Sequence, residues 1–101
     1  MELKKFVKKP IVVEGILITR ENINEVYRWL EDEFKDRTVR LIPNLYDGQV
    51  RISVKNSRSN ESLNFSIGDY AIKGVDGTVY PCKGSTFPKI YEETVPGAIY
   101  W

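Results

Sequence analysis

The sequence of 101 residues contains no histidine and a single cysteine, Cys82. Without histidine, the chain cannot assemble a Ser-His-Asp or Cys-His nucleophilic system, and it lacks the commonest zinc ligand. One cysteine forms no disulfide within the chain and no structural zinc site, which agrees with a reducing compartment. Walker loops and dinucleotide fingerprints are missing as well. The sequence therefore favours a protein that is not an enzyme and that uses no metal or cofactor.

Long apolar runs are also missing. None approaches the roughly 20 residues that a membrane-spanning helix needs, and the segment before Pro10 lacks the apolar centre of a secretory signal. A net charge of +1 gives no overall attraction to nucleic acid or to an anionic membrane. With 42% hydrophobic and 29% charged residues, the composition is that of an ordinary globular domain. We expect a soluble, unexported single domain over residues 1–101 that binds no membrane.

A strand and a helix are predicted in the first third of the chain. The β-branched run between Phe6 and Thr19 predicts a strand that is central or near-central in its sheet. Asn22, with Glu25 three positions later, predicts the N-cap and capping box of a helix. The apolar stripe of this helix consists of Ile23, Val26, Tyr27, Leu30 and Phe34. We expect this stripe to pack on a sheet.

After residue 37 the apolar period changes from helical spacing to two. The segments 39–42, 50–54 and 63–67 therefore predict antiparallel strands, and the apolar residues of the second segment share one face. Turn-forming residues separate these segments. A hairpin joined to a third strand is expected here.

The last third predicts a second hairpin and a short helix. Asp76-Gly77 lies between β-forming residues, and both members of the pair tolerate the positive φ of a tight turn. Ser85 is the expected N-cap of the short helix, with Pro88 in its first turn. The element order predicts an α+β fold in which one main helix packs on a curved, mainly antiparallel sheet, with a C-terminal hairpin and a short second helix.

Aromatic and basic side chains form the main candidate site. These two types together stack on bases and hold phosphates, and they also populate protein interfaces. The ligand-binding candidates are Tyr70, Lys73, Tyr80, Lys83, Arg40 and Arg51, and the interface candidates are Tyr91, Tyr100 and Trp101. Ordinary packing is the alternative for each of them. The terminal aromatic pair either covers a neighbouring subunit, which would make a homo-oligomer, or folds back onto its own sheet.

Other reactive or charged groups have simpler explanations. Lys83 next to Cys82 could lower the pKa of the thiol, but adjacent strand residues point to opposite faces, so a buried core cysteine is expected. Asp69 and Asp76 are expected to form turns. The basic segment of residues 4–9 either protects an edge strand from aggregation or binds nucleic acid together with the arginines of the strands.

Two stretches of the chain carry a family resemblance. They are the run from Lys8 to Glu14, and the run from Gly68 to Gly77 followed by Tyr80-Pro81-Cys82-Lys83, Phe87 and Tyr91. Together they resemble a widespread group of small phage and prophage proteins with a PGDYG-type C-terminal motif, with Ile67 where the motif usually has proline. The resemblance implies bacteriophage origin and expression in the cytoplasm of a bacterial host, and it carries no activity with it.

The expected function follows from the missing catalytic sets and from this resemblance. We expect a small, phage-encoded, non-catalytic binding protein that counters host defence by binding a host protein or by sequestering a nucleotide-like signal. A nucleotide sponge requires aromatic and basic groups in one pocket, whereas a protein inhibitor presents a flat apolar patch. The alternative is a nucleic-acid-binding accessory protein that uses the basic N-terminal segment and loses affinity steeply with salt.

Overall fold

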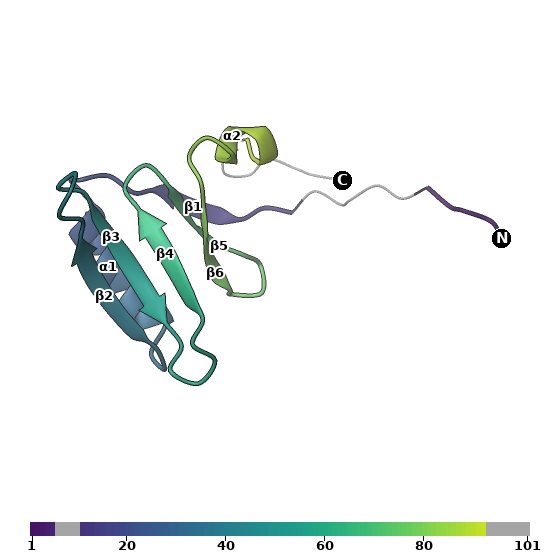
Figure 1. Ribbon diagram of the computed structural model, residues 1–101. Helices are drawn as coiled ribbons and strands as arrows, with labels where there is room; N and C mark the ends of the chain where they lie inside the picture. The colour runs from purple at the N-terminus through teal and green to yellow at the C-terminus, as the bar shows by residue number, and fades with distance from the viewer. Residues whose placement is uncertain (6–10, 93–101) are drawn as a thin grey trace.

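The computed structural model describes residues 1–5 and 11–92. Its elements in chain order are β1 (Glu14–Leu17), α1 (Ile23–Glu33), β2 (Thr38–Pro43), β3 (Val50–Lys55), β4 (Ser62–Ser66), β5 (Tyr70–Lys73), β6 (Val79–Cys82) and α2 (Phe87–Ile90). The predicted α+β class, with one main helix, a C-terminal hairpin and a short second helix, is confirmed (Figure 1). No helix among the described residues is long and apolar enough to cross a membrane.

The strands form two antiparallel three-stranded sheets, one with the order β2-β3-β4 and the other with the order β1-β5-β6 (Figure 1). Strands β4 and β6 lie in contact where the two sheets meet. Both predicted hairpins are present as β2–β3 and β5–β6. In the second hairpin Gly77 adopts a φ of +84°, which agrees with the turn role predicted for the Asp76-Gly77 pair.

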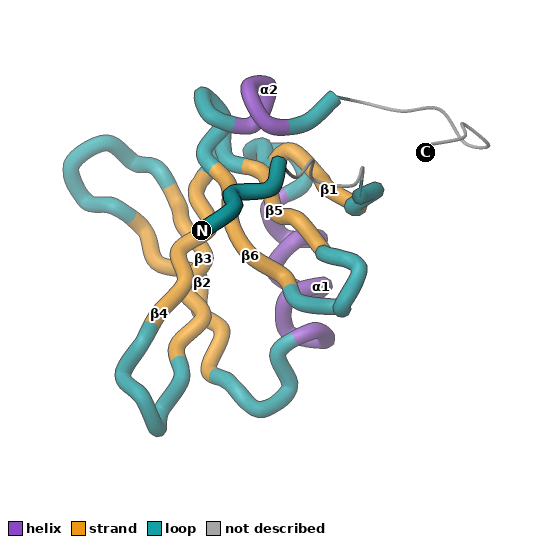
Figure 2. Tube along the Cα trace, turned by 90° about the vertical axis from the view of Figure 1, so that its right-hand side faces the viewer, coloured by secondary structure: helices purple, strands orange, loops and turns teal. Residues whose placement is uncertain are grey.

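Helix α1 packs on one side of the β2–β3–β4 sheet, and no helix of the described residues covers the opposite side (Figure 2). The buried core consists of Ile18, Ile23, Val26, Leu30, Ile52, Val54, Phe65, Ala71 and Val79. These residues come from α1 and from both sheets, so one helix holds the two sheets together. Trp29 also packs against this core, although the predicted stripe did not include it.

The predicted position of the α1 N-cap is correct, but the predicted capping box is not. Asn22 precedes the helix and makes no side-chain hydrogen bond to it. Instead, its Oδ1 accepts a hydrogen bond from the Thr19 amide at 2.8 Å, and its Nδ2 donates to the Leu17 carbonyl at 2.8 Å. The side chain is therefore engaged by the preceding turn, and it ties the start of α1 to the end of β1.

Among the described residues, strand β1 lies at an edge of its sheet, so the predicted central or near-central position is wrong. It pairs with β5 on one edge, and no described strand pairs with its other edge. All of its residues are exposed, including Ile16 and Leu17. The apolar residues on both faces of β1 therefore do not indicate a strand that is buried within its sheet. Residues 6–10 of the predicted strand lie outside the described residues.

Helix α2 begins one residue later than the predicted cap implied. Its N-cap is Thr86 rather than Ser85, and Pro88 lies in the first turn as predicted. The reason is a turn that starts at Lys83, whose carbonyl accepts hydrogen bonds from the amides of Thr86 and Phe87 at 3.0 and 2.9 Å. This turn sets the point at which the helix starts.

Candidate ligand-binding surface

The side of the β2–β3–β4 sheet opposite to α1 is the surface with the most uniform chemistry. Side chains alternate along a strand, so the register assigns nine residues of these strands to this side. They are Thr38, Arg40 and Ile42 of β2, Arg51, Ser53 and Lys55 of β3, and Ser62, Asn64 and Ser66 of β4. We call these nine residues the outer face. Their neighbours along each strand, such as Ile52 and Phe65, face the core.

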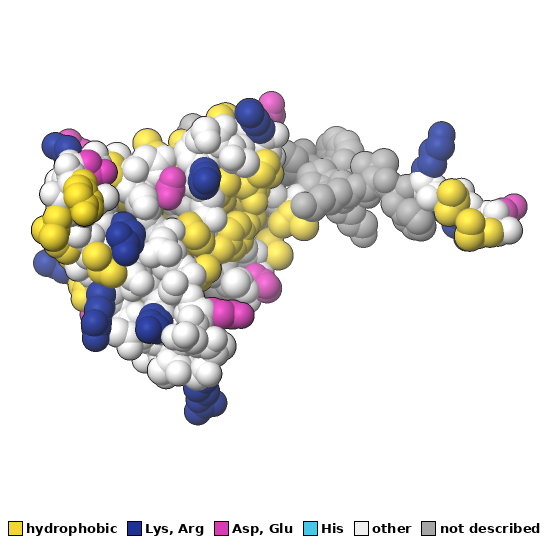
Figure 3. Space-filling model, in the orientation of Figure 1, with side chains coloured by type: hydrophobic (Ala, Val, Ile, Leu, Met, Phe, Trp, Pro, Cys, Tyr) yellow, Lys and Arg dark blue, Asp and Glu magenta, His cyan; other side chains and the backbone are white. Residues whose placement is uncertain are grey.

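The outer face carries positive charge and no carboxylate. Arg40, Arg51 and Lys55 are all exposed, and the other positions are hydroxyl or amide side chains except for Ile42. In residues 1–5 and 11–92, none of these three cations forms an ion pair. Over these strands, dark blue Lys and Arg atoms lie mainly among the white atoms of other side chains and of the backbone (Figure 3). Guanidinium, ammonium and hydroxyl groups are the side chains that proteins use to bind phosphate oxygens.

The side chains of the outer face leave most donor groups of its arginines free to bind a ligand. The Nε atom of Arg51 donates to Oδ1 of Asn64 at 3.3 Å, across the β3–β4 pair. This bond occupies one of the five guanidinium donors and leaves the others for a ligand. Arg40 lies opposite Ser53, so a hydroxyl donor lies beside the guanidinium. The face is therefore partly organised before any ligand binds.

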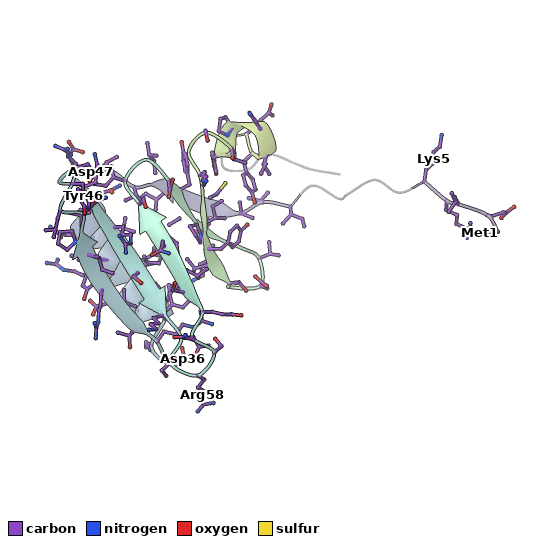
Figure 4. All side chains as sticks on the ribbon, viewed as in Figure 1. Met1, Lys5, Asp36, Tyr46, Asp47 and Arg58 are labelled. Atoms are coloured by element: carbon purple, nitrogen blue, oxygen red, sulfur yellow. The ribbon has the colours of Figure 1, made fainter. Side chains whose placement is uncertain are left out.

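Carboxylates lie at the margins of the outer face, in the β2–β3 turn and beyond β4, where Oδ2 of Asp69 accepts a hydrogen bond from the Ser66 amide at 3.3 Å. Figure 4 shows Asp47 and Tyr46 in the turn at one end, and Asp36 at the opposite end of β2. Oδ1 of Asp47 accepts a hydrogen bond from the Gln49 amide at 2.9 Å, so this carboxylate stabilises the turn. Tyr46 is fully exposed, with a relative accessibility of 101%. An aromatic ring is thus available at one end of the positively charged face.

A hollow of about 350 Å³ adjoins this end of the face. Arg51 and Ser66 line both the hollow and the outer face, and Asn44, Asp47 and Gln49 add polar groups from the turn. This volume lies in the range of about 300 to 1,000 Å³ that small-molecule sites have. The hollow and the outer face are therefore continuous at Arg51 and Ser66.

The predicted ligand-binding residues are divided among four places. Arg40 and Arg51 share the outer face, whereas Tyr70 and Tyr80 belong to the other sheet. Lys73 lies three positions after Tyr70, so it points to the opposite side of β5. Its Nζ atom is 2.9 Å from Oε1 of Glu33, and this hydrogen bond raises the pKa of Lys73. Lys83 is exposed beyond β6.

Tyr70 and Tyr80 pack helix α2 onto the β1–β5–β6 sheet. The ring of Tyr70 stacks on Phe87 with centroids 3.7 Å apart, and Phe87 stacks on Tyr91 at 5.0 Å. The hydroxyls of Tyr80 and Tyr91 are 3.0 Å apart, and this hydrogen bond, together with desolvation, raises the pKa of Tyr80 to about 12. Tyr91, an interface candidate, thus makes its observed contacts within the chain. The other two interface candidates, Tyr100 and Trp101, lie outside the described residues.

Cys82 is only half-buried, so the predicted buried core cysteine is wrong. It pairs across the hairpin with Tyr70, on the side of the sheet that α2 only partly covers. Its Sγ atom lies 3.8 Å from the Lys83 carbonyl oxygen. Within the part of the chain that the structure describes, no cluster of three His, Cys, Asp or Glu residues is placed to hold a metal ion.

Sequence reasoning missed Lys55, Ser53 and Asn64, although the alternating pattern contained the signal. Val50, Ile52 and Val54 were correctly placed on one face, and the same alternation puts Arg51, Ser53 and Lys55 on the other. Asn64 follows from pairing with Ser53, which the sequence does not specify. Of the lysines in the predicted basic segment, Lys5 lies away from the sheet (Figure 4), and residues 6–10 are outside the described part.

Compared with protein-family models, curated proteins and solved structures, the chain matches none of them. The description of the candidate site therefore rests on the geometry and chemistry of this chain.

Proposed function

We propose that this protein is a non-catalytic binding protein that holds a phosphate-bearing, nucleotide-like ligand on the outer face of β2–β3–β4. The supporting observation is the composition of that face, which combines Arg40, Arg51 and Lys55 with hydroxyl and amide groups and has no carboxylate. Charge-assisted hydrogen bonds from such groups bind phosphate more strongly than neutral donors do.

The spacing of the three cations favours a ligand with more than one phosphate. Arg51 and Lys55 are four residues apart on β3, which separates their Cα atoms by about 13 Å along the strand. Arg40 lies on the neighbouring strand, level with Ser53 between them. A single phosphate group is too small to contact both ends of this row. The hollow beside Arg51 offers room for a base, and exposed Tyr46 offers a ring for stacking.

The biological setting in this proposal comes from the resemblance to small phage proteins. A phage protein in the cytoplasm of a bacterial host that holds a nucleotide signal withdraws this signal from the host's defence. Such a protein needs affinity and abundance but no chemistry, which agrees with the missing histidine and with the lack of any catalytic set in the sequence. Occupancy is therefore the proposed mode of action.

The test is calorimetric titration of the protein with ATP, a cyclic dinucleotide and inorganic pyrophosphate at low and high salt. Arg40→Gln and Arg51→Gln should each weaken the binding of the preferred ligand about tenfold, because each removes a charge-assisted contact of about 1.5 kcal/mol or more. Arg28→Gln is the matched control, since Arg28 is an exposed residue of α1. Equal loss in all three variants, or no binding of any probe, would contradict the proposal.

A single-stranded oligonucleotide is the second candidate ligand, because the long row of cations also fits successive backbone phosphates. With three cations engaged, the slope of log affinity against log salt should be about −2, since each single-strand contact contributes roughly 0.7. An affinity that rises with oligonucleotide length and exceeds that of every mononucleotide would favour this candidate. Preference for a small nucleotide would favour the first.

A further inference from the structure

A cleft of about 360 Å³ lies between strand β1 and helix α1. It borders the β1–β5–β6 sheet, whereas the outer face belongs to the β2–β3–β4 sheet. Its lining includes Glu14 and Ile16 of β1, Lys73 of β5, and Glu25, Val26 and Trp29 of α1. We call it the β1–α1 cleft. The side chains come from three elements, and α1 is anchored in the core by Val26 and Leu30, which are both buried.

The cleft borders an open strand edge. One edge of β1 pairs with β5, from Glu14 opposite Lys73 to Leu17 opposite Tyr70. Among the described residues, no strand pairs with its other edge. An exposed edge of this kind presents unpaired N–H and C=O groups that accept an additional strand from another chain. Ile16 and Leu17 are about 40% exposed on this strand, so apolar surface accompanies the open edge.

The chemistry of the cleft specifies which side chain it accepts. Glu14 and Glu25 are exposed and supply two carboxylates, whereas the one lining cation, Lys73, is already paired with Glu33 at 2.9 Å. Ile16, Val26 and the half-buried ring of Trp29 supply an apolar wall. A lysine or arginine side chain matches both properties, because its aliphatic stem packs on apolar surface while its charged head meets carboxylates or a tryptophan ring.

We propose that the β1 edge is a docking site for an extended segment of a partner protein, which adds to β1 as a strand and places a lysine or arginine in the β1–α1 cleft. Alternation along the added strand directs every second side chain toward α1, where the cleft lies. The charge complementarity of Glu14 and Glu25 selects a basic segment and disfavours an acidic one. This inference is independent of the ligand proposed for the outer face.

The fluorescence of Trp29 tests the proposal directly. Trp101→Phe leaves Trp29 as the only tryptophan, since the chain has two. The probe is an eight-residue peptide with alternating lysine and valine, and we expect a saturable change in the emission of Trp29. A peptide with alternating glutamate and valine should bind at least tenfold more weakly. The lysine peptide with every second amide N-methylated should also bind at least tenfold more weakly, because it cannot complete the strand ladder.

Charge variants locate the site. The double variant Glu14→Gln with Glu25→Gln should weaken the lysine peptide about tenfold, and Glu31→Gln, an exposed glutamate of α1, is the matched control with unchanged affinity. Unchanged emission at millimolar peptide, or equal binding of the N-methylated peptide, would overturn the proposal. Concentration-dependent dimerisation that Ile16→Lys abolishes would overturn it as well, because the edge would then serve a second copy of this chain.

Discussion

Two backbone segments approach each other closely at Gly68 and Gly84. This approach, rather than a side-chain contact, restricts which residue type can occupy position 84. Gly68 has a φ of +97°, in the region that favours glycine. A Cβ atom at Gly84 would collide with the carbonyl oxygen of Gly68. This contact joins the turn before β5 to the segment after β6, so it fixes where the chain turns toward α2. The requirement at Gly84 does not follow from local sequence pattern, because Gly68 is far from it in the chain.

Gly84→Ala should therefore destabilise the fold. We expect a loss of about 1–3 kcal/mol in the free energy of unfolding, because the backbone of one segment must shift to admit the methyl group. Denaturant-induced unfolding followed by circular dichroism measures this change. Gly15→Ala is the matched control, since its added Cβ would meet its nearest neighbour, the Ala71 carbonyl oxygen, at 3.6 Å, an ordinary contact distance. Equal unfolding midpoints for both variants would contradict the account of Gly84.

Residue-level predictions from the sequence succeeded where the strand period alone decides them. Val50, Ile52 and Val54 share the core-facing side of β3, as their alternation predicts. Tyr70 and Lys73 were grouped in one ligand site although an odd spacing places them on opposite sides of a strand. Trp29 was not anticipated as a wall of a cleft, since its position depends on where α1 meets the β1–β5–β6 sheet. Thus the alternation of side chains was available from the sequence, and the long-range contacts were not.

At the scale of elements, α2 is attached to the sheet by aromatic contacts rather than by aliphatic burial. None of its own residues is buried, and it has only four residues. The contacts that hold it are the stacked rings of Tyr70, Phe87 and Tyr91 and the hydroxyl pair of Tyr80 and Tyr91. This arrangement gives a packing role to the aromatic residues of the predicted ligand site.

The hydroxyl pair predicts a pH dependence. The pKa of Tyr80 is raised to about 12, first by its hydrogen bond with Tyr91 and then by desolvation. In the unfolded chain this phenol titrates near its ordinary pKa of about 10. The unfolded state therefore loses its proton first, and stability falls as the pH rises from about 10 through 12. Below pH 10 this contribution is fully present.

Tyr91→Phe should lower the pKa of Tyr80 toward its ordinary value. Ultraviolet absorbance of the phenolate during an alkaline titration measures it, and the Tyr80→Phe variant identifies which step belongs to Tyr80. Tyr46→Phe removes a fully exposed hydroxyl outside this cluster and should leave the step of Tyr80 in place. An unchanged Tyr80 step in Tyr91→Phe would show that the hydroxyl pair does not determine the pKa.

Elements with local signals were predicted well, and their assembly was not. Helix α1 and both hairpins follow from periodicity and turn residues over short stretches. The placement of β1 at an edge depends on its pairing with β5, where Glu14 lies opposite Lys73, across most of the chain. A β-branched run that is apolar on both faces is compatible with a central strand and also with an edge strand beside a cleft. Only the tertiary arrangement distinguishes these two positions.

At the scale of the whole molecule, the small net charge conceals an uneven distribution. The chain carries 15 basic and 14 acidic residues, which balance almost completely. The outer face nevertheless has three cations and no carboxylate. The β1–α1 cleft is lined by two carboxylates and by one cation, Lys73, which is already paired with Glu33. Overall composition therefore could not reveal either surface. The two surfaces lie on different sheets and differ in charge, so the two proposals assign a different ligand to each.

The measurement that tests the central claim most directly is a titration of the isotope-labelled protein with the best nucleotide probe, followed by nuclear magnetic resonance of the backbone amides. The account predicts saturable shifts for Arg40, Arg51, Ser53, Lys55 and Asn64, with the amides of β1 and β5 unchanged. Shifts confined to β1, β5 or α2, or no saturable shift at millimolar probe, would contradict it.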